Sequence, residues 1–138
     1  MKKLILFFLI ISLLASGFTH TKKFKYGIIF NDEPFTLENA QTYKRSFKRN
    51  ERIYWLFMSK KSLTKVPYIK IQVAQTNSKG PIRAITGISY THEYRTNPNT
   101  PHYFTDYVVM HSAGHYYMEV FDKNNLLRPL VVADFFVK

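Results

Sequence analysis

Alternation of apolar and polar residues with a period of two most constrains the fold of this 138-residue chain. The segment Tyr68–Gln75 reads YIKIQVAQ, with isoleucine or valine at every second position up to Val73. Successive side chains of a β-strand point to opposite faces, so this spacing predicts a strand with one buried face. The segment Arg52–Met58, RIYWLFM, is apolar at both sets of positions, which indicates a central strand covered on both sides. Strands are therefore expected to dominate the fold.

Turn-forming segments such as NDEP, TNSKGP and DKNN divide the chain into about seven apolar segments. That number of strands is typical of a two-sheet antiparallel sandwich. We predict an all-β fold, a single immunoglobulin-like or fibronectin-type β-sandwich spanning residues 18–138. The predicted strands are Phe24–Phe30, Arg52–Met58, Tyr68–Gln75, Ile82–Tyr94 with a bulge near Gly87, Tyr103–Met110, Tyr116–Asp122 and Leu130–Val137.

A short run near the C-terminus resembles a known pattern. It is similar to the G-x-Y-x-x-x-V-x-D run that opens the penultimate strand of many immunoglobulin-like and fibronectin-type sandwiches, with matches at Gly114, Tyr116, Val120 and Asp122. The resemblance implies that Tyr116 bonds back to a nearby backbone group. The chain has no cysteine pair, but Trp55 lies in a strand that could be the one carrying the core tryptophan. The resemblance covers only Gly114–Val137 and implies a fold rather than a function.

The N-terminus has the layout of a secretory signal peptide over residues 1–17. Lys2 and Lys3 precede the apolar run Leu4–Ala15, and small residues predict cleavage after Gly17. The run is shorter than the roughly 18 to 20 apolar residues that a spanning helix needs. The alternative is an uncleaved N-terminal anchor. Both readings predict an exported protein, located in the periplasm, at the cell surface or secreted.

The charge of the chain favours anionic partners. The sequence has 20 basic and 9 acidic residues, and 18 basic residues remain when Lys2 and Lys3 are left out. A field of this sign attracts membrane surfaces, acidic polymers and acidic proteins. Export makes nucleic acid the least expected partner, so we predict a protein or an anionic envelope component, with membrane contact only through an uncleaved N-terminal segment. The absence of cysteine excludes a disulfide-linked partner. No cofactor is predicted.

Two segments carry the residue types of binding surfaces. Tyr43–Arg52 reads YKRSFKRNER, and Arg95–Pro101 reads RTNPNTP, a predicted exposed loop because proline disrupts a central strand. Arginine, histidine and aromatic residues on loops are typical of binding sites. The alternative is that the lysines keep a β-rich surface soluble and block edge pairing. The predicted binding residues are Arg45, Lys48, Arg49, His92, Tyr94, Arg95, His102 and Tyr103.

Catalytic and metal-binding patterns are weak. His111 and His115 flank a turn near two methionines, but on a strand His115 faces away from Met118 because their offset is odd, so no metal site is predicted. No Gly-x-Ser-x-Gly or His-Glu-x-x-His motif occurs, and the five glycines are too scattered for a phosphate-binding loop. We therefore expect an exported, non-enzymatic interaction module. The alternatives are a periplasmic small-ligand or metal-handling protein that uses the His-bearing loops, and assembly by strand addition.

Overall fold

The computed structural model describes residues 25–77 and 84–138. The predicted signal peptide, Phe24 and residues 82–83 lie outside the described residues. No helix within those two ranges is long and apolar enough to cross a membrane. The described elements are β1 (Tyr26–Asn31), β2 (Ser46–Phe47), β3 (Arg52–Ser59), the 3-10 helix η1 (Leu63–Lys65), β4 (Tyr68–Asn77), β5 (Ala84–Arg95), β6 (Tyr103–Val109), β7 (Gly114–Asp122) and β8 (Val131–Val137).

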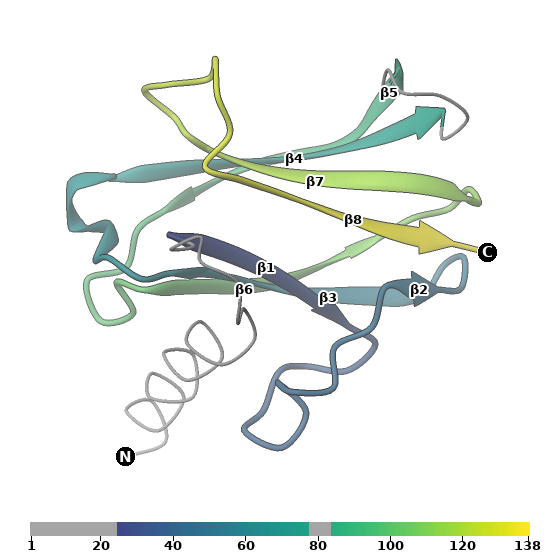
Figure 1. The fold of residues 1–138 in the computed structure, drawn as a ribbon, viewed down its shortest axis with the longest axis horizontal. Helices are drawn as coiled ribbons and strands as arrows, with labels where there is room; N and C mark the ends of the chain where they lie inside the picture. Colours follow the sequence, from purple (N-terminus) through teal and green to yellow (C-terminus); the bar gives the residue numbers. More distant parts are fainter. Residues whose placement is uncertain (1–24, 78–83) are drawn as a thin grey trace.

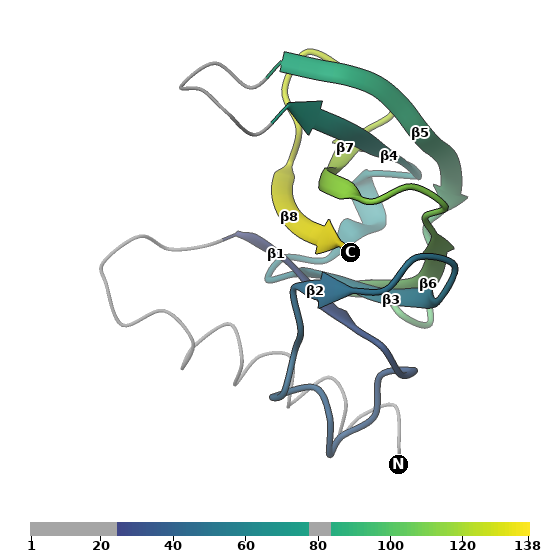
Figure 2. The same ribbon diagram turned by 90° about the vertical axis from the view of Figure 1, so that its right-hand side faces the viewer.

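The strands form two sheets that pack face to face (Figures 1 and 2). One sheet has the order β1-β3-β6 and the other has the order β2-β8-β7-β4-β5. The predicted all-β sandwich is confirmed, as is the predicted irregularity near Gly87, where the β4–β5 register shifts twice. Among the described strands every pairing is antiparallel except the two-residue parallel pair of β2 with β8, which was not predicted.

The strand order is that of an immunoglobulin-like sandwich. The order β8-β7-β4-β5 corresponds to the G-F-C-C′ sheet of such domains, and β3 and β6 correspond to strands B and E. Trp55 is fully buried and packs edge-on against Tyr94 of β5, with ring centroids 5.6 Å apart. It stands on β3, however, whereas the core tryptophan of immunoglobulin domains stands on strand C. Its role as a core residue is confirmed, and its proposed correspondence to that strand is wrong.

Tyr116 forms the corner that the resemblance implied. Its hydroxyl donates a hydrogen bond of 2.7 Å to the carbonyl oxygen of Ser112, just before β7. The side chain is buried, and its ring stacks on Phe135 of β8 with centroids 5.5 Å apart. This bond ties the β6–β7 connection to the core, as in immunoglobulin-like domains.

The strand β3 is buried on both faces, as its sequence predicted. Trp55 and Phe57 point into the main core between the sheets. Leu56 and Met58 point the other way and pack with Phe35, which belongs to the segment between β1 and β2. Figure 2 shows that this segment passes across the outer side of the three-stranded sheet. The outer side of the three-stranded sheet is therefore covered around Leu56 and Met58.

Candidate functional site

Three connections meet at one end of the sandwich, on the left in Figure 1. They are residues 60–67 between β3 and β4, the proline loop Arg95–Pro101 between β5 and β6, and residues 123–130 between β7 and β8. The strand register brings them together, since Arg95 pairs with Tyr68, and the Lys123 N–H donates to the Tyr68 carbonyl oxygen across 3.1 Å. We call this region the loop end. In immunoglobulin variable domains the B–C and F–G loops at the equivalent end bind ligands.

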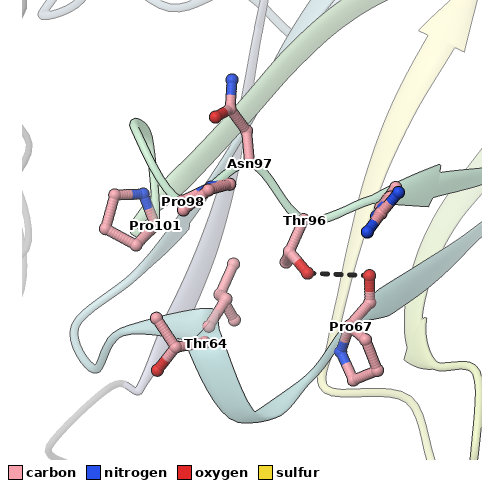
Figure 3. Close-up of a pocket in the computed structure, with 8 residues that line it drawn as sticks. Thr64, Pro67, Thr96, Asn97, Pro98 and Pro101 are labelled. Atoms are coloured by element: carbon pink, nitrogen blue, oxygen red, sulfur yellow. Dashed lines mark hydrogen bonds between the residues drawn. The ribbon is translucent and has the colours of Figure 1, made fainter.

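A pocket of about 300 Å³ opens at the loop end between η1 and the proline loop (Figure 3). The Thr96 hydroxyl lies 2.7 Å from the carbonyl oxygens of both Val66 and Pro67, which ties the proline loop to the start of β4. The Leu63 N–H donates to the Pro101 carbonyl oxygen across 2.8 Å. These bonds and the fixed proline φ angles preorganise the walls. The lining residues are Leu63, Thr64, Pro67, Arg95, Thr96, Asn97, Pro98 and Pro101.

Positive charge is concentrated at the loop end. Its three connections contain no aspartate or glutamate, and the nearest carboxylates along the chain are Glu93 and Asp122. Glu93 is bonded to Lys123 across 2.7 Å and raises the pKa of that lysine. Asp122 accepts a hydrogen bond from the backbone N–H of Asn124. The exposed basic residues are Lys60, Lys61, Lys65, Arg95, Lys123 and Arg128.

Two exposed leucines project from the β7–β8 connection, between Lys123 and Arg128. Leu126 is 50% exposed and Leu127 is 93% exposed. The turn beneath them is fixed, because the Asn125 N–H donates to the Asp122 carbonyl oxygen across 2.8 Å. The sequence pattern of this segment predicts only a turn and does not single out the leucines. The sequence does contain a sign of them, because two adjacent leucines are unusual inside a polar turn that is too short to reach the core.

The predicted binding residues around the proline loop do not form one surface. Arg95 alone among them lines the pocket. The His102 ring nitrogen Nδ1 lies 3.1 Å from the carbonyl oxygen of Ser59, so this side chain contacts the end of β3. Tyr103 packs against Leu56 and Met58 on the outer side of the three-stranded sheet.

His92 and Tyr94 lie on the side of the sandwich where β5 faces β6. The Tyr94 hydroxyl donates to Asp106 of β6 across 2.8 Å and lies 3.0 Å from the hydroxyl of Tyr90. The His92 ring packs edge-on against Tyr94, with centroids 4.5 Å apart. Burial raises the pKa of Tyr94 strongly, and its hydrogen bonds with Tyr90 and Asp106 raise it further. Tyr94 therefore acts as a neutral bridge between the two sheets.

The basic segment Tyr43–Arg52 lies away from the loop end. Arg45 forms an ion pair with Asp134 of β8. Lys48 and Arg49 stand in the turn between β2 and β3, near the C-terminal residue, where the Arg49 N–H donates to the Lys138 carbonyl oxygen across 3.2 Å. Within the described parts of the chain, the side chains of Lys48 and Arg49 have no ion-pair partner. The two groups of predicted binding residues thus occupy different regions of the molecule.

The two histidines weighed as metal ligands have separate polar partners. The Nδ1 atom of His111 lies 2.8 Å from the Asn50 side-chain oxygen, and the Nε2 atom of His115 lies 2.8 Å from Asp134. Burial alone would raise the pKa of Asp134, but its bond with His115 and the charge of Arg45 outweigh burial and lower it. In residues 25–77 and 84–138 no group of three or more histidine, cysteine, aspartate or glutamate side chains is placed to hold a metal ion.

Comparison with known proteins supports the fold. No protein-family model and no curated protein sequence matches the chain. The soluble domain of PmoD from a Methylocystis species matches with a TM-score of 0.52 and 11% identity, covering 86% of this chain and 95% of that one. The DNA glycosylase AlkC from Pseudomonas fluorescens matches at a TM-score of 0.44 and 11% identity, covering 83% of this chain and 30% of AlkC. At 11% identity, the similarity to PmoD shows only a shared β-sandwich fold. The similarity to AlkC is too low to support a conclusion.

Proposed function

We propose that this protein is an exported, non-enzymatic interaction module that docks on an anionic component of the cell envelope through its loop end. The observation that carries the proposal is the combination of exposed basic side chains and two exposed leucines on three connections without a carboxylate. Export rests on the signal-peptide pattern of residues 1–17. The main contact surface is thus the loop end and not the basic segment Tyr43–Arg52.

The physical reason is that the two kinds of side chain have complementary tasks. A cluster of like charges attracts an oppositely charged partner and orients its approach. Exposed aliphatic side chains then stabilise the contact when they leave water, by about 1.5 to 3 kcal/mol for a fully buried leucine. Leu127, at 93% exposure, has almost its entire side chain available for such burial.

The proposal of a non-enzymatic role rests on the bonding of the acidic groups near the loop end. Glu93 is paired with Lys123, and Asp122 accepts a backbone hydrogen bond from the turn. General acid or base chemistry requires a titratable group aimed at a reacting atom. The carboxylates adjoining the loop end are instead engaged in holding the connections in place.

The test is retention of residues 18–138 on isolated cell envelope, with crosslinking, at low and at high salt. The loop-end variant combines Lys61→Glu with Lys65→Glu. The matched control combines Lys48→Glu with Arg49→Glu in the β2–β3 turn, where both side chains are also exposed and the change in net charge is identical. We expect several-fold lower retention of the loop-end variant at low salt and a smaller loss for the control.

Salt separates the two contributions. At 1 M salt the Debye length is about 3 Å, so contacts made by charge alone are lost. Retention that survives the high-salt wash should disappear when Leu126 and Leu127 are replaced by serine. Equal losses in the two charge-reversal variants would mean that only net charge matters and would contradict docking through the loop end.

A further inference from the structure

A second surface lies on the side of the sandwich where the edges of the two sheets meet. The strand β1 is an edge of the three-stranded sheet, and Figure 2 shows β8 above it. The strand β8 pairs with β2 only at Phe136 and Val137. Among the described residues no strand pairs with the other edge of β8 from Val131 to Phe135. Five residues of β8 therefore present an open edge.

The hydrogen bonds of β2 fix which backbone groups point to this edge. The N–H groups of Phe136 and Lys138 donate to the carbonyl oxygens of Arg45 and Phe47, across 2.8 and 2.9 Å. Alternate residues of a strand direct their backbone groups to the same side. The N–H and C=O groups of Val132 and Asp134 consequently point to the open edge, while those of Val131 and Ala133 point to β7. Unpaired backbone groups in a row are a template for another strand.

A groove of about 240 Å³ runs beside this edge. It exists because the chain crosses from one sheet to the other just before β2. The Lys44 N–H donates to the Phe30 carbonyl oxygen of β1, and one residue later the Arg45 carbonyl oxygen accepts from β8. This crossing closes one end of the groove. Its lining residues are Ile28, Ile29, Phe30, Tyr43, Arg45, Val132, Ala133 and Asp134.

The open part of β8 lacks the usual protection of an edge strand. Lysine, proline and bulges are the common devices that prevent strand addition. The segment Val131–Phe135 reads VVADF, and its only charged residue, Asp134, is neutralised by Arg45 and bonded to His115. The edge strand β5, in contrast, is itself irregular, because its register with β4 shifts twice and leaves extra residues on β5, and it carries Glu93 and Arg95 near its end.

We infer that this groove binds an extended peptide segment of a partner protein, which adds as a strand to β8. The backbone groups of Val132 and Asp134 would pair with the peptide, and apolar side chains at every second position of the peptide would contact the groove wall formed by β1. The inference is independent of the loop end. It concerns another surface and another class of partner.

The short length of the open edge favours a peptide over a second copy of this chain. From Phe136 onward, β2 occupies the edge position. An antiparallel β8 from a second copy would bring the chain that precedes its own Val131 into the space of β2. A flexible segment of about five residues meets no such obstacle.

The probe for this inference is the synthetic peptide acetyl-KTVTVTVK-amide, and amide hydrogen exchange by NMR is the readout. In the protein alone, we expect slow exchange at Val131 and Ala133, which bond to β7, and fast exchange at Val132 and Asp134. Addition of the peptide should slow exchange at Val132 and Asp134. The control peptide carries backbone N-methyl groups on alternate residues, so it keeps the apolar side chains but loses the pairing hydrogen bonds.

Two proline variants separate binding from folding. Val132→Pro removes an N–H that has no partner among the described residues, so the fold should persist while the peptide affinity falls about tenfold. Ala133→Pro removes an N–H that bonds to β7 and should destabilise the protein. Unchanged peptide affinity in a folded Val132→Pro variant would overturn the inference. Protection of Val132 and Asp134 without peptide would overturn it as well, because the edge would then be occupied by this chain or, if protection grows with protein concentration, by a second copy.

Discussion

Replacing Tyr116 by phenylalanine tests how much the corner before β7 stabilises the sandwich. The Tyr116 hydroxyl donates to the Ser112 carbonyl oxygen across 2.7 Å, and the residue is only 2% exposed. The substitution deletes one oxygen atom and keeps the ring that stacks on Phe135. It leaves the Ser112 carbonyl without this donor, and the expected loss in the free energy of unfolding is about 1 to 3 kcal/mol.

Urea denaturation measures this loss directly. We expect a lower midpoint at an unchanged slope, because the surface exposed on unfolding stays the same. The melting temperature should fall by roughly 4 °C for each kcal/mol. The control is Tyr43→Phe, since Tyr43 is 55% exposed and its hydroxyl has no hydrogen-bond partner among the described residues. An unchanged Tyr116→Phe variant, or equal losses in both variants, would refute the structural role of the corner.

Two further predictions concern pH. Burial raises the pKa of Tyr94 and of Tyr116 above the ordinary value of 10.0, so above that pH the unfolded chain releases protons that the folded state keeps. The contribution of these two tyrosines to the free energy of unfolding should therefore be fully present below about pH 10 and decline at higher pH. Tyr94→Phe should weaken that decline in a pH series of urea denaturation. At the acid end, the pKa of Asp134 lies below the ordinary value of 3.8, so its stabilisation should be present above that pH and be lost as the pH falls through the folded-state pKa. Melting curves of Asp134→Asn should lack this part of the acid loss, and an identical acid profile in the two proteins would contradict the pairing with His115 and Arg45.

The strands that alternate or are apolar throughout could be predicted, because the pattern reports burial directly. In β4 the alternating Ile69, Ile71 and Val73 are all fully buried, and β3 is buried on both sides. The strand β2 could not be found in this way. It has two residues, too few to show a period, and its parallel pairing depends on the crossing of the chain between the sheets.

The candidate site was less accessible to sequence reasoning. His92 and Tyr94 are close to the proline loop in the sequence, and for that reason they were predicted to belong to the same surface. They stand on β5, however, and both side chains lie on the side of the sandwich where β5 faces β6. The loop end is a product of topology, since it joins three connections that are distant in the sequence. The exposed leucines became visible only when the core was known not to include them.

The two-sided burial of β3 has a consequence for solubility. The run Ile53–Met58, IYWLFM, combines high β propensity with no charge and no proline, which is the composition of segments that nucleate aggregation when a chain is unfolded. Basic residues stand on both sides of it, with Arg49 and Arg52 before and Lys60 and Lys61 after. Flanking charges of this kind act as gatekeepers against intermolecular stacking. We therefore expect these four residues to act in the unfolded chain. Their charges repel the same residues of other unfolded chains, which disfavours association through β3 until folding buries this strand.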